Sequence, residues 1–157
     1  MKNTINIDEI KKFLDKANKH TYANKNASKV ATTRLKSEDY NFEEGDLIYH
    51  DTYFGEKDFI GGEIVYKNEN PVLGANYFGF ILDNKISEKE IYNFLRQALM
   101  LDYESEVPVR GPVEFSIGEW TYNFTVNGNL SNFQGEEQIL FKGKIAYRGL
   151  IHGGFVR

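Results

Sequence analysis

The sequence has no cysteine, which excludes disulfide bonds, thiolate zinc sites and cysteine nucleophiles. It also has no run of about 18 consecutive apolar residues, the length that a membrane-spanning helix needs. Residues 1–12 carry charges throughout and lack the apolar stretch of a signal peptide. We therefore expect a cytoplasmic protein that does not associate with a membrane.

An excess of basic residues is missing as well. The chain has 19 Lys and Arg residues against 23 Asp and Glu residues, which gives a net charge of −4. Nucleic-acid binders usually carry a basic excess, so we expect no direct binding to nucleic acid. The sequence has no serine elbow, no phosphate-cradling glycine loop and no nucleotide fingerprint. The three histidines are not at a chelating spacing, so we predict neither a metal site nor a cofactor.

Aromatic residues, in contrast, are abundant. They make up 15% of the chain and are almost all Phe and Tyr, which favour strands. A chain of 157 residues can bury roughly 70% of the surface it exposes when unfolded, enough for a core without staples. Because no linker divides the sequence, we expect a single domain over residues 1–157.

The clearest strand pattern lies in residues 114–152. Apolar and polar residues alternate over residues 120–126, which is typical of a half-buried strand. Asn127 and Gly128 follow, the pair that a type I′ hairpin turn favours. That turn predicts these cross-strand pairs: Val126 with Asn129, Phe124 with Ser131, Tyr122 with Phe133, and Trp120 with Gly135.

A second turn at residues 142–143 has the sequence Lys-Gly. It predicts that Leu140 faces Ile145 and that Glu137 faces Arg148 on the following strand. The last third of the chain is therefore expected to form an antiparallel meander with an aromatic face.

Two helices are predicted from apolar stripes with helical spacing. The first begins near residue 7, where Asn6 is placed to cap it. The second covers about residues 87–101, and Ser87 and Glu90 have the spacing of a capping box. Residues 20–46 show no regular period and are expected to form a long loop with one short strand near residues 30–33.

Further strand signals occupy residues 47–54, 63–67 and 72–81, the last two joined by a turn at residues 68–71. Helices separated from antiparallel strands in this order are typical of an α+β domain. We predict a curved antiparallel sheet of about six to eight strands with two main helices packed against it.

Several short strings are spread along the chain: residues 21–23 (TYA), 49–55 (YHDTYFG), 58–63 (DFIGGE), 76–79 (NYFG), 110–112 (RGP), 120–122 (WTY), 133–137 (FQGEE) and 152–154 (HGG). Together they resemble a bacterial family of domains of unknown function. Its members look like small free-standing proteins or like tails fused behind helix-turn-helix heads, which implies a sensor or effector-binding module. The first predicted helix is followed by a long loop and not directly by a second helix, so the sequence predicts no helix-turn-helix.

Our main hypothesis is an aromatic pocket for a small molecule on the helix side of the sheet. Aromatic rings would hold the body of the ligand, and a few ionisable groups would orient it. Arginine binds carboxylate or phosphate, and histidine and embedded acids exchange protons. The candidate ligand-binding residues are Asp51, Tyr53, Glu63, Tyr77, Arg110, Trp120, Glu137 and His152.

No motif names a reaction, and two functions of other classes stay open. One is a hydrolase that uses Glu63 or Asp51 together with His152, because buried acids suit general acid–base chemistry. The other is a protein-interaction module, such as a homodimer formed through an exposed strand edge.

Four of the candidates also have a purely structural explanation. Glu137 would form a cross-strand ion pair with Arg148. Asp51 and Glu63 would face solvent on a one-sided sheet. Arg110 would form a salt bridge that holds its extended segment to the second helix.

Overall fold

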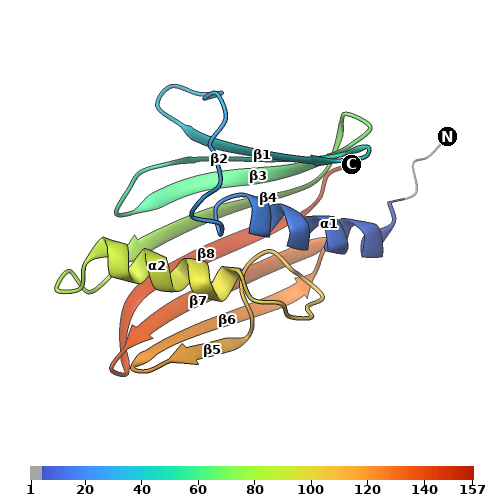
Figure 1. The fold of residues 1–157 in the computed structure, drawn as a ribbon. Coiled ribbons are helices and arrows are strands. Elements are labelled where there is room, and N and C mark those ends of the chain that lie inside the picture. The colour runs from blue at the N-terminus through green and yellow to red at the C-terminus, as the bar shows by residue number, and fades with distance from the viewer. Residues whose placement is uncertain (1–4) are drawn as a thin grey trace.

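Eight antiparallel strands form one open sheet, and two helices lie on one of its faces in the computed structural model, which describes residues 5–157 (Figure 1). The elements are α1 (Ile7–His20), β1 (Glu38–Glu44), β2 (Leu47–Phe54), β3 (Phe59–Lys67), β4 (Asn70–Ile81), α2 (Glu88–Leu99), β5 (Glu114–Ile117), β6 (Trp120–Asn129), β7 (Asn132–Phe141) and β8 (Lys144–Phe155).

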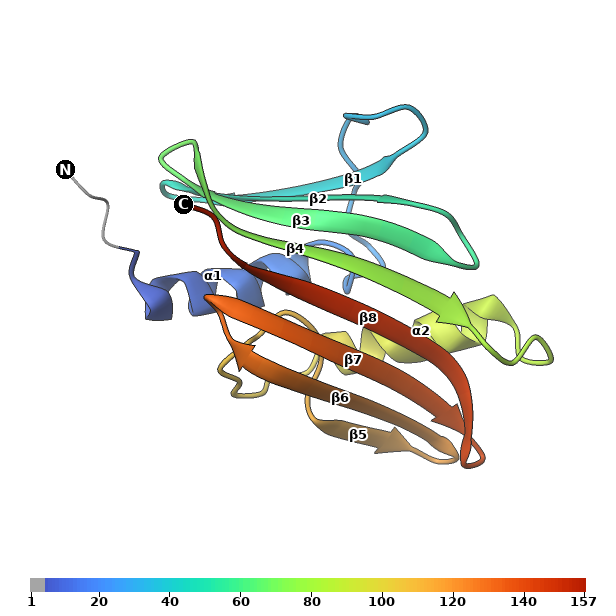
Figure 2. The same ribbon diagram turned by 180° about the vertical axis from the view of Figure 1, so that it is seen from behind.

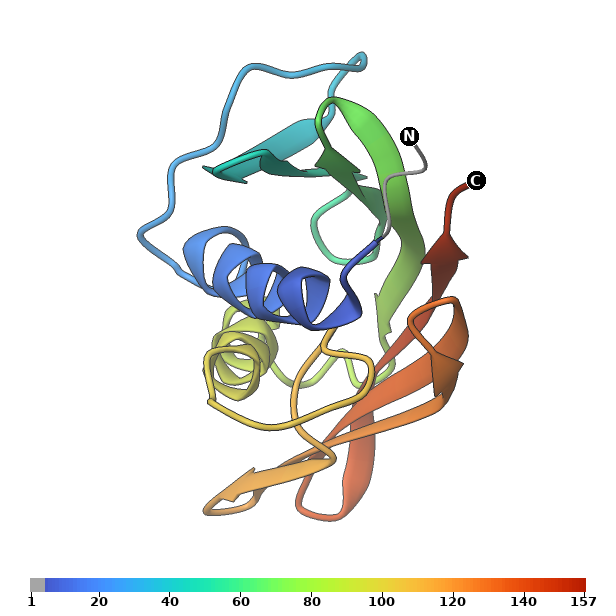
Figure 3. The ribbon, with the colours of Figure 1, turned by 90° about the vertical axis from the view of Figure 1, so that its right-hand side faces the viewer.

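The strand order across the sheet is β1-β2-β3-β4-β8-β7-β6-β5. Two meanders thus meet at β4 and β8, which lie side by side although α2 and three strands separate them in sequence (Figure 2). Seen from the side, both ends of the sheet bend toward the helices (Figure 3). The prediction of an α+β fold with a curved antiparallel sheet is confirmed.

The helices form where the sequence supplies both an apolar stripe and a cap. In α1 the stripe is buried, and the Asn6 side chain accepts hydrogen bonds from the backbone of Asp8 and Glu9. In α2 the predicted capping box is present, with Ser87 and Glu90 each bonded to the other's backbone. Neither helix within residues 5–157 is both long enough and apolar enough to cross a membrane.

Part of the region predicted as a loop is a strand. Residues 38–44 form β1, which pairs with β2 along its whole length at the edge of the sheet. Its sequence is rich in acids and lacks a clear alternation, so the strand is stabilised by pairing with β2 rather than by its own pattern. The short strand expected near residues 30–33 is reduced to one bridge between Val30 and Asp39.

The predicted register of the β6–β7 hairpin is wrong, because the turn lies further along the chain. Asn129 pairs with Asn132, and Trp120 consequently lies opposite Phe141 rather than Gly135. The Asn129 side chain accepts a hydrogen bond from the backbone of Ser131 at 2.9 Å, and the intervening Leu130 is buried. This local turn and the burial of Leu130 outweigh the turn preference of the Asn-Gly pair.

The register of β7 and β8 is correct next to the turn and shifts beyond it. Leu140 faces Ile145 as predicted, but an irregularity between Ile139 and Leu140 places Glu137 opposite Gly149. Glu137 therefore does not pair with Arg148, whose guanidinium binds Glu136 at 2.8 Å instead.

Candidate functional site

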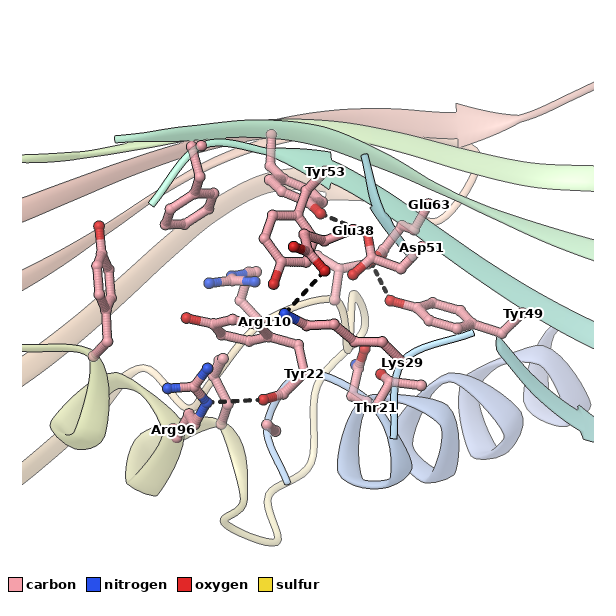
Figure 4. Close-up of a pocket in the computed structure, with 18 of the residues that line it drawn as sticks. Thr21, Tyr22, Lys29, Glu38, Tyr49, Asp51, Tyr53, Glu63, Arg96 and Arg110 are labelled. Atoms are coloured by element: carbon pink, nitrogen blue, oxygen red, sulfur yellow. Dashed lines mark hydrogen bonds and ion pairs between the residues drawn. The ribbon is translucent and has the colours of Figure 1, made fainter. Parts of the chain in front are cut away.

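A cavity of about 210 Å³ lies between the concave face of the sheet and the two helices (Figure 4). Its walls come from β1, β2, β3 and β4, from the turn between β2 and β3, from both helices, and from the segments that follow each helix. Six Tyr and Phe rings line it: Tyr22, Tyr49, Tyr53, Phe59, Tyr77 and Tyr92. We call this cavity the pocket.

Two carboxylates lie opposite each other in the wall of the pocket. Asp51 on β2 and Glu63 on β3 are direct cross-strand partners, and only 3% and 4% of their surfaces are exposed. We call them the acid pair. The expectation that they face solvent is wrong, because the alternation of β2 turns Tyr49 and Asp51 inward together.

Tyrosine hydroxyl groups bind the acid pair from both sides. Tyr77 on β4 donates to Asp51 at 2.5 Å, and Tyr49 donates to Glu63 Oε2 at 2.7 Å. Within the described residues the other Glu63 oxygen, Oε1, is buried and has no hydrogen-bond partner. A buried oxygen without a donor is costly, so its presence at a cavity marks a position where a ligand can donate.

A glycine makes the Tyr77 contact possible. Gly61 on β3 lies between Tyr53 on β2 and Tyr77 on β4, facing the pocket. A Cβ at this position would lie 2.7 Å from the Tyr77 hydroxyl and 2.4 Å from the carbonyl oxygen of Thr52. The absence of a side chain therefore lets the Tyr77 ring cross β3 and reach Asp51.

The environment of the acid pair raises both of its pKa values. Burial is the main cause for Asp51, the charge of Glu63 adds to it, and the pKa of Asp51 rises to about 7 although the Tyr77 hydrogen bond opposes the change. Burial likewise raises the pKa of Glu63, against the hydrogen bond from Tyr49. Asp51 thus exchanges its proton near neutral pH.

Arg110 closes the inner end of the pocket and is already paired. Its guanidinium binds Glu137 through two contacts of 2.9 and 2.5 Å, and both side chains are largely buried. Tyr122 and Tyr147 also donate to this carboxylate, at 2.8 and 2.9 Å. Burial alone would lower the pKa of Arg110, but Glu137 raises it well above its usual value, so the guanidinium stays charged.

The segment that follows α1 forms the outer wall. Tyr22 lies against α2, where the Arg96 guanidinium is 4.4 Å from the centre of its ring and Arg96 Nε donates to its carbonyl oxygen at 3.1 Å. Further along, Lys29 forms an ion pair of 3.0 Å with Glu38 across the mouth. These contacts hold the segment over the pocket.

The structure brings five of the eight candidate residues to the pocket and a sixth beneath it. Those that line it are Asp51, Tyr53, Glu63, Tyr77 and Arg110. Glu137 lies beneath it and binds Arg110, so the salt bridge expected between Arg110 and the second helix is formed with β7 instead.

Trp120 and His152 are not part of the pocket. Trp120 packs between Phe94 and Phe141, at ring distances of 5.4 and 4.6 Å. His152 is exposed on the other face of the sheet, because Ile151 before it points into the core.

Sequence reasoning missed the pocket residues that the helices and the loop supply. On α2, Leu99 belongs to the buried apolar stripe, and Tyr92 and Arg96 lie one turn apart beside it. The stripe predicts the helix but does not show that these side chains line a cavity. Tyr22 and Lys29 lie in a segment without periodicity, which carries no such signal.

Residues 51–156, more than half of the chain, match a family described as "Domain of unknown function (DUF5680)". The match includes the acid pair, Arg110 and Glu137, and does not include α1 or the segment after it. The comparison with curated proteins gives no match, and neither does the comparison with solved structures.

Proposed function

We propose that this chain, which belongs to the DUF5680 family of domains of unknown function, binds a small organic molecule in the pocket. In this proposal it acts as a sensor-like binding domain in the bacterial cytoplasm, and ligand occupancy is the signal it provides. The ligand's body lies among the aromatic rings, and its polar end reaches the acid pair.

The observation that carries the proposal is the unpartnered Glu63 oxygen at the wall of an aromatic cavity. Small-molecule sites are typically apolar and aromatic hollows with a few convergent polar groups and shifted pKa values. A volume of about 210 Å³ suits a compact ligand, because a cavity of about 150 Å³ already holds benzene.

A thermal-shift screen against a metabolite library tests the proposal. A ligand at about 100 times its Kd stabilises the folded state by about 2.7 kcal/mol, which corresponds to roughly 5–10 °C in Tm for a domain of this size. We expect at least one compound to give a shift of this order.

A pocket-filling variant and a matched control locate the binding. Ala23 is buried and lines the pocket, whereas Ala31 is exposed in the same loop. Ala23→Phe should abolish the ligand-induced shift, while Ala31→Phe should retain it, with circular dichroism confirming that both variants fold. No shift from any compound, or an equal shift in Ala23→Phe, would rule out the pocket as the binding site.

A hydrolase is the second candidate, and the pKa of about 7 at Asp51, opposite the buried Glu63, favours it. In this alternative Glu63 and Asp51 act as acid and base without His152, which is exposed on the opposite face of the sheet. Turnover of a panel of chromogenic glycosides and esters tests it. Activity lost in both Asp51→Asn and Glu63→Gln would support catalysis, and no turnover above the buffer rate would reject it.

A further inference from the structure

The charges around the inner end of the pocket do not balance. Asp51, Glu63 and Glu137 are buried acids, and Arg110 is the one cation that lies among them in the described part of the chain. Its guanidinium donates to Glu137 through both Nε and Nη2. The acid pair is therefore left without a hydrogen-bonded cation of its own.

The other cationic side chains that line the pocket already have partners in its outer wall. Lys29 pairs with Glu38 at 3.0 Å, and the Arg96 guanidinium stacks on the Tyr22 ring. Both groups belong to the outer wall, so they do not neutralise the acid pair. The positive charge that neutralises the acid pair must come from a bound ligand or from protons.

The donor geometry also points to a ligand that donates. Tyr49 and Tyr77 each donate one hydroxyl hydrogen to the acid pair. Glu63 Oε1 is left as a buried acceptor without a donor. An ionised carboxylate only accepts hydrogen bonds. A ligand group that carries several N–H donors and a positive charge can donate to Glu63 Oε1 and also neutralise the negative charge of the acid pair.

The rings beside the acid pair suit the body of such a ligand. Tyr53 and Tyr77 flank the pocket-facing Gly61 on the sheet, and Phe59 packs against Tyr77 with ring centres 5.8 Å apart. Aromatic faces attract organic cations as well as apolar groups. The pocket thus has an aromatic wall next to two buried acids.

We propose that the pocket selects an organic ammonium or amidinium ion, whose charged group binds between Glu63 and Asp51 and whose ring or alkyl body lies against Tyr53, Tyr77 and Phe59. This inference rests on the proposed binding function and specifies the chemical class of its ligand. Benzamidine and benzylamine are suitable probes, since each carries one small ring and one cationic group. Their neutral isosteres are benzamide and benzyl alcohol.

Isothermal titration calorimetry at constant ionic strength compares each cation with its isostere. We expect the cations to bind about 10- to 100-fold more tightly, as one charge-assisted hydrogen bond provides. Glu63→Gln should remove most of this preference while the variant still folds, because glutamine keeps an acceptor for Tyr49. Glu136→Gln is the matched control, since Glu136 neighbours Glu137 on β7 but binds Arg148 and does not line the pocket.

The outcomes separate this inference from the proposed function. Equal binding of cations and isosteres, or a preference kept in Glu63→Gln, would overturn the cation assignment. A library compound that is neutral or anionic and binds in the pocket, while both cationic probes fail, would also overturn it but would leave the pocket function intact. Failure of every compound, including the library, would reject the proposed function itself.

Discussion

Replacing Asp51 by asparagine should stabilise the protein at pH 8 and change its stability little near pH 4.5. Burial and the neighbouring Glu63 raise the pKa of Asp51 from 3.8 to about 7. Between these two values the unfolded chain has already released the proton that the folded chain still holds. Stability therefore falls as the pH rises through this window and stays low above it. Asparagine has no charge to bury, so the variant escapes this loss.

The magnitude follows from the two pKa values. A rise from 3.8 to about 7 costs the folded state about 4 kcal/mol at pH 8, at about 1.4 kcal/mol for each pKa unit. This is a large share of the roughly 5–15 kcal/mol that stabilises an ordinary domain. Asparagine can still accept the hydrogen bond from Tyr77, but its amide group needs a new partner. We expect a net gain of about 2–4 kcal/mol at pH 8 and of at most about 1 kcal/mol at pH 4.5.

Urea denaturation followed by tryptophan fluorescence measures this effect from pH 4.5 to 8.5. The chain has one tryptophan, Trp120, which packs between Phe94 and Phe141 and so reports on the folded core. The quantity to compare is the free energy of unfolding of Asp51→Asn minus that of the wild type at each pH. The difference should grow with pH and level off above about pH 7, the pKa of Asp51.

Asp39 supplies a control of opposite sign. It is also fully buried, but hydrogen bonds from Ser37, Thr33 and His50 outweigh the effect of burial and hold the pKa of Asp39 well below 3.8. Its ionised form therefore stabilises the folded state above pH 3.8, and this contribution is lost only as the pH falls through the lower value. Asp39→Asn should be destabilising throughout the same pH range. A gain in Asp51→Asn that is independent of pH, or a loss at pH 8, would refute the buried acid pair.

Three further variants probe the surroundings of the pocket. Arg110→Met leaves Glu137 buried without its cation, and we expect urea denaturation to show a loss of about 3–5 kcal/mol; a loss below 1 kcal/mol would contradict the pairing. Gly61→Ala forces a Cβ against the Tyr77 hydroxyl and the sheet backbone, at a cost of about 1–3 kcal/mol that calorimetry would detect. Ser87→Ala removes the cap of α2 and should cost about 1 kcal/mol, whereas an unchanged Tm would mean that the cap is dispensable.

The sequence predicts those parts of the fold whose signals are local. Alternation marks β2 and β6 because each has one buried face, and the cap at Ser87 fixes the start of α2. Register is different, since the irregularity after Ile139 shifts every pair beyond it by one residue. A displaced turn has the same effect, as the β6–β7 hairpin with its buried Leu130 illustrates.

The pocket residues also differ in whether a local sequence signal predicts them. Asp51, Tyr53, Glu63 and Tyr77 are recognisable because they lie at inward positions of strands whose alternation is visible. The pair of Arg110 with Glu137 is not, because it joins an extended segment to a strand through tertiary packing alone. His152 is predicted to bind a ligand because glycines follow it. The alternation of β8 instead turns its side chain outward, away from the pocket.

The acid pair lowers the stability of the folded state, and the fold does not require acids at these positions. Leucine or glutamine at position 63 would fill a similar volume without placing a charge opposite Asp51. Buried groups that lower stability and face a cavity are typical of sites where binding restores the lost energy. A ligand cation that binds the acid pair would favour the ionised carboxylates and so lower their pKa values. Because the pKa of Asp51 is about 7, binding near that pH would by the same linkage release protons. Proton release on binding, measured by calorimetry in buffers of different ionisation enthalpy, should therefore accompany the cationic probes and be smaller in Glu63→Gln, which keeps only Asp51 of the acid pair. Cation binding near pH 7 without any proton exchange would contradict the raised pKa of Asp51.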